Sequence, residues 1–289
     1  LVLLGTPRLD RFTEQGGPKT SVSPGKSLAL FTYLALAPHR SASRERLCDL
    51  LWGDKSAEDA RTQLRQTLYL LKQQVGADVF EARAHDIALV ADAEVDSRLF
   101  TAEIAAGRLE PAERLYAGDF FSGFASPGAR EFENWVDLER ARLKALFVRT
   151  CETLAGLALD RGNFPEAVRL ARRLREVDEF GEIGWRILLE ALTSAGDSLG
   201  ARAEADHFER WLQAEERTPE PETLSALRAA RQVARPTQSG HHDGDLVAEL
   251  VGREREFAVL QRLWGEARTK GTRRAHVAGE SGLGKTRLL

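Results

Sequence analysis

This 289-residue sequence contains no methionine and only two cysteines. Cys48 and Cys151 are far apart, lie in helical patterns and lack the spacing of metal ligands. They therefore argue against a disulfide framework or a zinc site, and we expect two buried free thiols in a reducing compartment. Because the sequence starts at Leu1 and has no methionine, we also expect it to be an internal or trimmed segment of a longer chain.

Long apolar runs are missing as well, since none approaches the ~20 residues of a membrane span. The sequence also lacks a basic segment followed by an apolar stretch, the pattern of a secretory signal. With 43% hydrophobic and 29% charged residues, the composition is that of a soluble globular protein. These features predict a cytoplasmic protein without a membrane partner, and the length predicts two or more domains.

Charge of either sign is not in excess, because the formal net charge is only −3. The whole chain is therefore not a general binder of polyanions, and local charge must decide that question. Residues 1–75 differ from the rest, with eleven Lys and Arg against seven Asp and Glu, a net charge of +4. This segment is the candidate for contact with an anionic partner.

The first ninety residues begin with short strands and continue with helices. Turns rich in glycine and proline separate three strand candidates, at residues 1–4, 8–12 and 19–22. Helical periodicity then predicts two helices, at residues 26–37 and 44–52. Pro38 ends the first of them, and Ser43 is a suitable N-cap for the second.

A third helix is predicted from Ser56 to about Val75, because Ser56 and Asp59 match a capping box. Its apolar side chains share one arc of the helix: Ala57, Ala60, Leu64, Leu68, Leu71 and Val75. Its cationic side chains fall within about 40° of one another: Arg61, Arg65 and Lys72. Four further polar side chains widen the cationic face: Thr62, Gln66, Tyr69 and Gln73.

The side chains of this polar face suit DNA, because Arg, Gln, Thr and Tyr contact phosphates and base edges and a helix fits the major groove. The alternative is a solvated helix face. The preceding helix–turn–helix pattern and the local positive charge favour DNA. The candidate DNA contacts on this helix are Arg61, Thr62, Arg65, Gln66, Tyr69 and Lys72.

A β-hairpin is predicted after the third helix, with strands at residues 78–81 and 87–91 and Arg83 near its tip as a further candidate DNA contact. Three strands, three helices and a hairpin predict a winged helix over residues 1–93. The order resembles the OmpR-type winged-helix DNA-binding domain. The strings LLWGD and ARTQLRQ, which begin at Leu50 and Ala60, more closely resemble the SARP-type (Streptomyces antibiotic regulatory protein) family. Leu70 departs from that family, where many members have a basic residue, and this favours a modest affinity.

Residues 94–232 are almost entirely helical in pattern and contain an internal repeat. The string GNFPEA at residues 162–167 recurs as GDSLGA at residues 196–201, a shift of 34 residues that is the period of the tetratricopeptide repeat (TPR). The same shift pairs three further positions: Leu154 with Leu188, Ala171 with Ala205, and Leu174 with Phe208. Two repeats alone leave apolar faces uncovered, so we expect flanking helices around residues 131–157 and 221–232 to cap the stack.

Helical stacks of this kind usually bind proteins, and the alternative is a scaffold that fixes the winged helix to later domains. A cluster of arginines on the first repeat is interpreted as a solvated face: Arg172, Arg173 and Arg175. The strings FFSGF at residues 120–124 and EFENW at residues 131–135 resemble the bacterial transcriptional activator domain of SARP-type regulators. That resemblance implies binding to double-stranded promoter DNA, recruitment of RNA polymerase, location at the nucleoid and, as a further option, self-association on repeated half-sites.

The sequence ends on a phosphate-binding motif, GESGLGKT at residues 279–286, which fits the P-loop pattern. In such a loop, backbone N–H groups and the lysine bind phosphates, and the hydroxyl binds Mg²⁺. The candidate contacts for ATP are Gly279, Gly282, Leu283, Gly284, Lys285 and Thr286, with Thr286 as the ligand of Mg²⁺.

A flexible polar linker is predicted at residues 233–248, and the start of a P-loop α/β ATPase domain at residues 249–289. The string LVGRERE, which begins at Leu250, resembles the start of STAND-type signalling ATPases. That resemblance implies that Val251, Gly252 and Arg253 lie near the adenine and sugar. No water-activating residue or second metal carboxylate is present, so no catalytic residue is assigned and ATP is expected to act as a switch.

The sequence therefore predicts a mainly α protein with a winged helix (α+β), a TPR-like helical repeat domain and the truncated start of a P-loop α/β ATPase. The expected function is a sequence-specific transcriptional activator that recruits RNA polymerase and is switched by ATP. The alternative is a STAND-type signalling ATPase whose N-terminal part is a protein-interaction scaffold that does not bind DNA.

Overall fold

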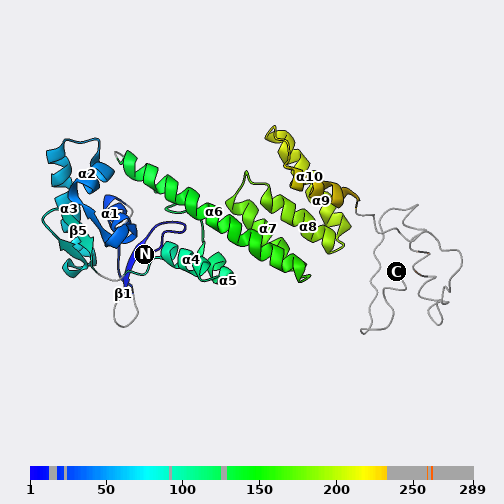
Figure 1. Ribbon diagram of the computed structural model, residues 1–289, viewed down its shortest axis with the longest axis horizontal. Coiled ribbons are helices and arrows are strands. Elements are labelled where there is room, and N and C mark those ends of the chain that lie inside the picture. Colours follow the sequence, from blue (N-terminus) through cyan, green and yellow to red (C-terminus); the bar gives the residue numbers. More distant parts are fainter. Residues whose placement is uncertain are drawn as a thin grey trace. The chain divides into compact units, whose positions relative to one another are not determined.

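The computed structural model describes residues 1–12, 18–22, 25–90, 93–124 and 129–232, together with Val259 and Arg262 (Figure 1). The chain divides into two compact units, Leu1–Arg235 and Pro236–Leu289. The predicted linker and the candidate nucleotide contacts, from Val251 to Thr286, lie outside the described residues.

The N-terminal part of the first unit contains two small antiparallel sheets and three helices. Its elements are β1 (Leu9–Phe12), β2 (Pro18–Val22), α1 (Lys26–Leu36), the 3₁₀ turn η1 (Pro38–Arg40), β3 (Ser41–Ser43), α2 (Arg44–Trp52), α3 (Ala57–Val75), the 3₁₀ turn η2 (Ala77–Val79), β4 (Phe80–Ala82) and β5 (Asp86–Leu89). One sheet pairs β1 with β2, and the other has the strand order β3-β5-β4. We call these elements the N-terminal module.

The starts of α2 and α3 follow their predicted capping residues. Ser43 Oγ accepts a hydrogen bond from the backbone N–H of Arg46 at 3.1 Å. Ser56 Oγ accepts one from the backbone N–H of Asp59 at 3.2 Å. Each bond satisfies an N–H group that has no partner inside its own helix. Both predicted helix starts are confirmed.

The structure corrects one strand prediction and adds one strand. Strand β3 was not predicted, and it pairs with β5 so that Ala42 lies opposite Ile87. Its Ser-Ala-Ser sequence has no strand pattern of its own, so the neighbouring strand decides its conformation. Residues 1–4, predicted as a strand, instead form isolated bridges from Val2 and Leu4, the latter with Phe120.

Helix α3 is anchored by its apolar side. Five of the six predicted apolar residues are buried: Ala60, Leu64, Leu68, Leu71 and Val75. Ala57 is exposed, because it is the first residue of α3 and lies before the part of the helix that packs. The buried residues join the core formed by α1, α2 and β5. This core holds α3 with one face inward and the opposite face in solvent.

The rest of the unit is helical. It comprises α4 (Asp96–Ala105), α5 (Leu109–Leu115), α6 (Arg130–Asp160), α7 (Phe164–Val177), α8 (Ile183–Ser194), α9 (Ser198–Ala214) and α10 (Pro221–Gln232). The 31-residue helix α6 packs against both α2 and α7 (Figure 1). It therefore connects the N-terminal module with the helices that follow.

The 34-residue repeat corresponds to two helix pairs, α6 with α7 and α8 with α9. Gly162 and Gly196 turn the chain within each pair and have φ values of 71° and 73°, a conformation that glycine adopts most easily. The three pairs of positions related by the shift are all buried: Leu154 and Leu188, Ala171 and Ala205, Leu174 and Phe208. Helix α10 packs on α8 and α9 and covers the second pair, as expected of a capping helix.

An aromatic cluster attaches the N-terminal module to α6. Trp135 of α6 packs edge-on against Tyr33 of α1, with ring centres 5.2 Å apart, and against Phe120 at 5.9 Å. The Tyr33 hydroxyl also accepts a hydrogen bond from Arg46 Nε of α2 at 3.4 Å. One hydrophobic core runs from the N-terminal module into α6, α7 and α8. The orientation of the module relative to α6 is thus defined by packing.

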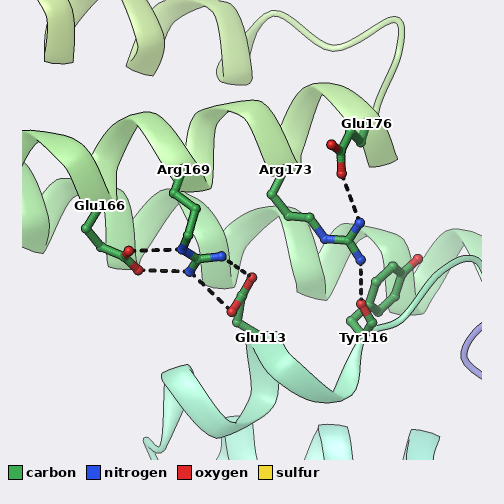
Figure 2. A network of polar contacts seen from close by, with 6 residues as sticks. All are labelled: Glu113, Tyr116, Glu166, Arg169, Arg173 and Glu176. Atoms are coloured by element: carbon green, nitrogen blue, oxygen red, sulfur yellow. Dashed lines mark hydrogen bonds and ion pairs between the residues drawn. The ribbon is translucent and has the colours of Figure 1, made fainter.

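Polar contacts attach α5 to α7 (Figure 2). Arg169 donates hydrogen bonds to both carboxylate oxygens of Glu113, at 3.0 and 3.3 Å, and also pairs with Glu166. Arg173 donates to the backbone carbonyl of Tyr116 at 2.8 Å and pairs with Glu176. The Glu113 side chain is only 9% exposed, so its carboxylate depends on Arg169 for a counter-charge.

The interpretation of Arg172, Arg173 and Arg175 as a solvated face is wrong for two of the three. Arg172 is exposed. Arg173 is bound to the backbone after α5, and the guanidinium carbon of Arg175 lies 3.4 Å from the ring centre of Trp185. Tyr116 and Trp185 lie outside α7, so the spacing within α7 does not reveal these two contacts.

Candidate nucleic-acid interface

The polar face of α3 lies at the surface of the N-terminal module. Arg61, Arg65, Gln66 and Tyr69 are exposed, and the Tyr69 side chain is among the most exposed aromatic groups, at 64%. Thr62 and Lys72 are partly buried. The candidate contacts predicted on this helix therefore project outward, whereas its leucines anchor it to the core.

Side-chain hydrogen bonds order one part of this face. Arg65 Nη2 donates to Thr62 Oγ1 at 3.1 Å, and Thr62 Oγ1 donates to the backbone carbonyl of Glu58 at 3.0 Å. The guanidinium has five N–H donors, and this hydrogen bond uses one of them. Arg65 is therefore held on the helix surface while keeping donors for a ligand.

A shallow depression lies beside this face, between α2 and α3. Its lining residues are Arg44, Glu58, Arg61, Leu64 and Arg65. Three arginines from two helices and one glutamate line it, so the local charge is positive. Because guanidinium groups bind phosphate oxygens through paired hydrogen bonds, the depression suits a phosphate group.

Arg44 was not among the predicted contacts, although it lines the depression. It is the first residue of α2, directly after the N-cap Ser43. A cation in the first turn of a helix interacts unfavourably with the helix dipole. An arginine at this position of the predicted helix is therefore a signal in the sequence that could have indicated a binding role for Arg44.

The hairpin β4–β5 is attached to the same corner of the module. The backbone N–H of Arg44 donates to the carbonyl of His85 at 2.9 Å, and Arg44 Nη2 donates to the carbonyl of Arg83 at 3.4 Å. The structure therefore brings the hairpin tip next to the depression that Arg61 and Arg65 line. The prediction that Arg83 lies near the tip is confirmed.

Arg83 itself forms an ion pair with Glu81 at 2.8 Å, and the two side chains are 57% and 51% exposed. Exposed pairs of this kind contribute little to stability. A phosphate group can therefore take the place of Glu81 at a small energetic cost.

Lys72 does not belong to this corner. It lies eleven residues after Arg61 on α3, which is about 16 Å along the helix axis. The cationic residues therefore form one cluster near the N-terminus of α3 and one separate cation near its C-terminus.

Within the described ranges, no group of three or more His, Cys, Asp and Glu side chains could hold a metal ion. No described helix has both the length and the apolar character needed to cross a bilayer. Cys48 and Cys151 are buried free thiols, as predicted. The polar surface of α3 and the depression beside it are the candidate site in the described part of the chain.

A comparison with known families gives a match over residues 77–232, more than half of the sequence, to the model described as "Bacterial transcriptional activator domain". The chain belongs to this family. The match begins at η2 and includes the hairpin and helices α4 to α10. Helix α3 precedes the matched residues, so the candidate DNA contacts on it rest on sequence and geometry.

Among solved structures, the chain is similar to one described as "Mycobacterium tuberculosis EmbR in complex with low affinity phosphopeptide". The TM-score is 0.58 and the sequence identity 20%, and the similarity covers 80% of this chain and 64% of the EmbR chain. At this identity the likeness shows the fold alone, a mostly helical protein with small antiparallel sheets near its N-terminus. The chain thus spans slightly less than two thirds of the EmbR chain. No curated protein gives a significant match.

Proposed function

We propose that this member of the bacterial transcriptional activator domain family is a sequence-specific, DNA-binding transcriptional activator of the SARP type. The observation that carries the proposal is the exposed polar face of α3, with Arg61 and Arg65 beside Arg44 and the hairpin tip. The family of residues 77–232 supports the role in transcription.

In this proposal the N-terminal module is a winged helix, α3 is its recognition helix and the β4–β5 hairpin is its wing. Arg44, Arg61 and Arg65 bind a backbone phosphate at the depression between α2 and α3. Lys72 binds a further phosphate near the other end of α3, and Arg83 binds one at the hairpin tip beside the depression. Phosphate contacts of this kind set the position of a helix in the groove but do not distinguish sequences.

Base recognition is assigned to the middle of the exposed face, where Thr62, Gln66 and Tyr69 lie. Gln can form two hydrogen bonds with adenine, and hydroxyl groups bond to either donors or acceptors. Each well-formed pair of hydrogen bonds contributes about 1–3 kcal/mol of discrimination against a wrong base. The buried leucines of α3 support this role, because they hold the helix rigidly to the core.

The repeats α6 to α10 are proposed to bind RNA polymerase while the N-terminal module is on promoter DNA. Support comes from the family of this segment and from the use of helical repeats as protein-binding surfaces. The protein would then act at the nucleoid in the cytoplasm. Self-association on repeated half-sites is part of the same proposal, and binding to DNA with one and two half-sites tests it.

Regulation by ATP is the remaining part of the proposal. It is supported by the P-loop sequence at residues 279–286, with Lys285 for the phosphates and Thr286 for Mg²⁺. Bound ATP would change the arrangement of the domains, and the parent protein would use its nucleotide as a switch. Equal affinity of the full-length protein for its operator in ATP and in ADP would contradict this part alone.

The test of DNA binding is the double variant Arg61→Ala/Arg65→Ala. Each lost phosphate contact should lower the slope of log K against log salt concentration by about one. The measurement is fluorescence anisotropy with a DNA site selected from a random pool, over a series of salt concentrations. Arg172→Ala is the matched control, since Arg172 is an exposed arginine on α7.

Unchanged affinity and an unchanged salt slope in the double variant would reject α3 as the DNA-binding helix. That result would favour a STAND-type signalling ATPase whose N-terminal part is a protein-interaction scaffold. A loss in the double variant together with an unchanged Arg172→Ala protein would support the proposal.

A further inference from the structure

Leu70 is an apolar residue on the polar surface of α3. Its side chain is 56% exposed. At about 100° per residue, Leu70 lies about 40° from Gln66 around the helix and about 60° from Gln73. Both glutamines are exposed. The same geometry puts Leu70 opposite Arg61, about 180° away. Around the helix, the exposed surface of α3 therefore passes from the cationic Arg61 through the two glutamines to the apolar Leu70.

Packing does not account for Leu70, because the core side of α3 is already complete. Ala60, Leu64, Leu68, Leu71 and Val75 are buried on that side. Helix propensity is an alternative explanation, since leucine is a strong helix former. Exposed leucines also occur elsewhere in the described chain, at Leu138 on α6 and Leu199 on α9. What distinguishes Leu70 is its position next to side chains that suit base edges.

The chemistry of the major groove provides a partner for this apolar edge. Among the four bases, only thymine presents a methyl group there. The adenine paired with that thymine presents N6 and N7, the groups that a glutamine amide recognises. An apolar side chain beside two glutamines therefore matches an A·T pair better than a G·C pair.

We propose that Leu70 is a specificity-determining residue that packs against the 5-methyl group of a thymine when α3 lies in the major groove. This inference rests on the proposed DNA-binding function and adds the kind of base pair that the helix recognises. A basic residue at this position would add electrostatic affinity for DNA, which is largely independent of sequence. Leu70 does not contribute that electrostatic affinity and instead contributes discrimination between base pairs.

The experiment uses the full chain and a DNA site selected from a random pool. Each thymine of the selected site is replaced in turn by deoxyuridine, which lacks only the 5-methyl group. Affinities are measured by anisotropy for the wild type, for Leu70→Ala and for Leu138→Ala. Because Leu70 is exposed and alanine is the best helix former, Leu70→Ala retains the fold. Leu138 is an exposed leucine on α6, so its variant is the matched control.

In the wild type, we expect deoxyuridine at one thymine of the site to weaken binding about fourfold, which corresponds to the ~0.8 kcal/mol of one buried methyl-sized group. The same replacement should have no effect in Leu70→Ala and its full effect in Leu138→Ala. The inference is overturned if no thymine methyl affects affinity, or if the effect in Leu70→Ala equals that in the wild type.

The two levels of the proposal fail in different ways. If Arg61→Ala/Arg65→Ala weakens binding and no methyl effect depends on Leu70, only the present inference is rejected. If no DNA sequence is enriched from the pool and the arginine variant changes nothing, the DNA-binding function is rejected and this inference with it.

Discussion

The contact between Arg169 and Glu113 gives a prediction whose size follows from the structure (Figure 2). Glu113 lies on α5 with its side chain only 9% exposed, and Arg169 on α7 donates two hydrogen bonds to it. Replacement of Arg169 by alanine leaves a carboxylate buried without its counter-charge. Removing one partner of a fully buried pair costs about 3–5 kcal/mol.

A smaller value applies here, because the Arg169 side chain is 49% exposed and solvent screens its charge. We therefore expect Arg169→Ala to lower the free energy of unfolding by about 2 kcal/mol. The double variant Arg169→Ala/Glu113→Ala also removes the buried carboxylate. The loss of unfolding free energy in the double variant should be smaller than the summed losses of the two single variants, by at least about 1 kcal/mol.

Urea denaturation followed by circular dichroism measures these differences through the midpoint, provided that the slope is unchanged. Arg142→Ala is the control, since Arg142 and Glu139 form an i,i+3 pair on the surface of α6, and it should cost less than about 0.5 kcal/mol. The reasoning would be refuted by an Arg169→Ala protein as stable as the control variant, or by strictly additive effects in the double variant.

Two further predictions concern the repeats and the thiols. Gly162→Ala should lower the free energy of unfolding by about 1–2 kcal/mol, because φ is 71° and a side chain is strained there even though nothing lies within 4 Å of an added Cβ. Gly156→Ala, within α6 near its C-terminal end and with the same open space, should be neutral or stabilising, and equal midpoints for the two variants in urea would contradict this. Burial raises the pKa of the Cys151 thiol to about 12 and also raises the pKa of Cys48, so both thiols should stay protonated at pH 8. Both should therefore be unreactive towards Ellman's reagent until urea unfolds the protein, and rapid reaction of the folded protein would contradict their burial.

The packing of α6 bears on how the proposed activities could be coupled. Trp135 contacts Tyr33 of α1, and Tyr33 accepts a hydrogen bond from Arg46 of α2. Arg44, two residues earlier in α2, lines the depression beside α3. The described contacts thus form a short path from the candidate phosphate site to the long helix that begins the repeats.

Local features of the sequence determined much of this architecture. Ser43 and Ser56 cap their helices because a hydroxyl satisfies N–H groups within three residues, which requires no distant partner. The buried arc of α3 and the outward direction of Arg61 and Arg65 follow from a period of 3.6 residues. The repeat was visible for the same reason, since each helix pair places its turn glycine and its core residues at constant spacing.

Tertiary structure alone decided the features that depend on residues far apart in the chain. Strand β3 exists because β5 pairs with it, some 45 residues away. Arg44 joins the candidate phosphate site because the hairpin tip and α3 meet at the start of α2. Arg173 and Arg175 are bound rather than solvated because α5 and α8 supply their partners. In each case the conformation or charge environment of a residue is set by contacts between elements, and spacing along a single element carries no information about them.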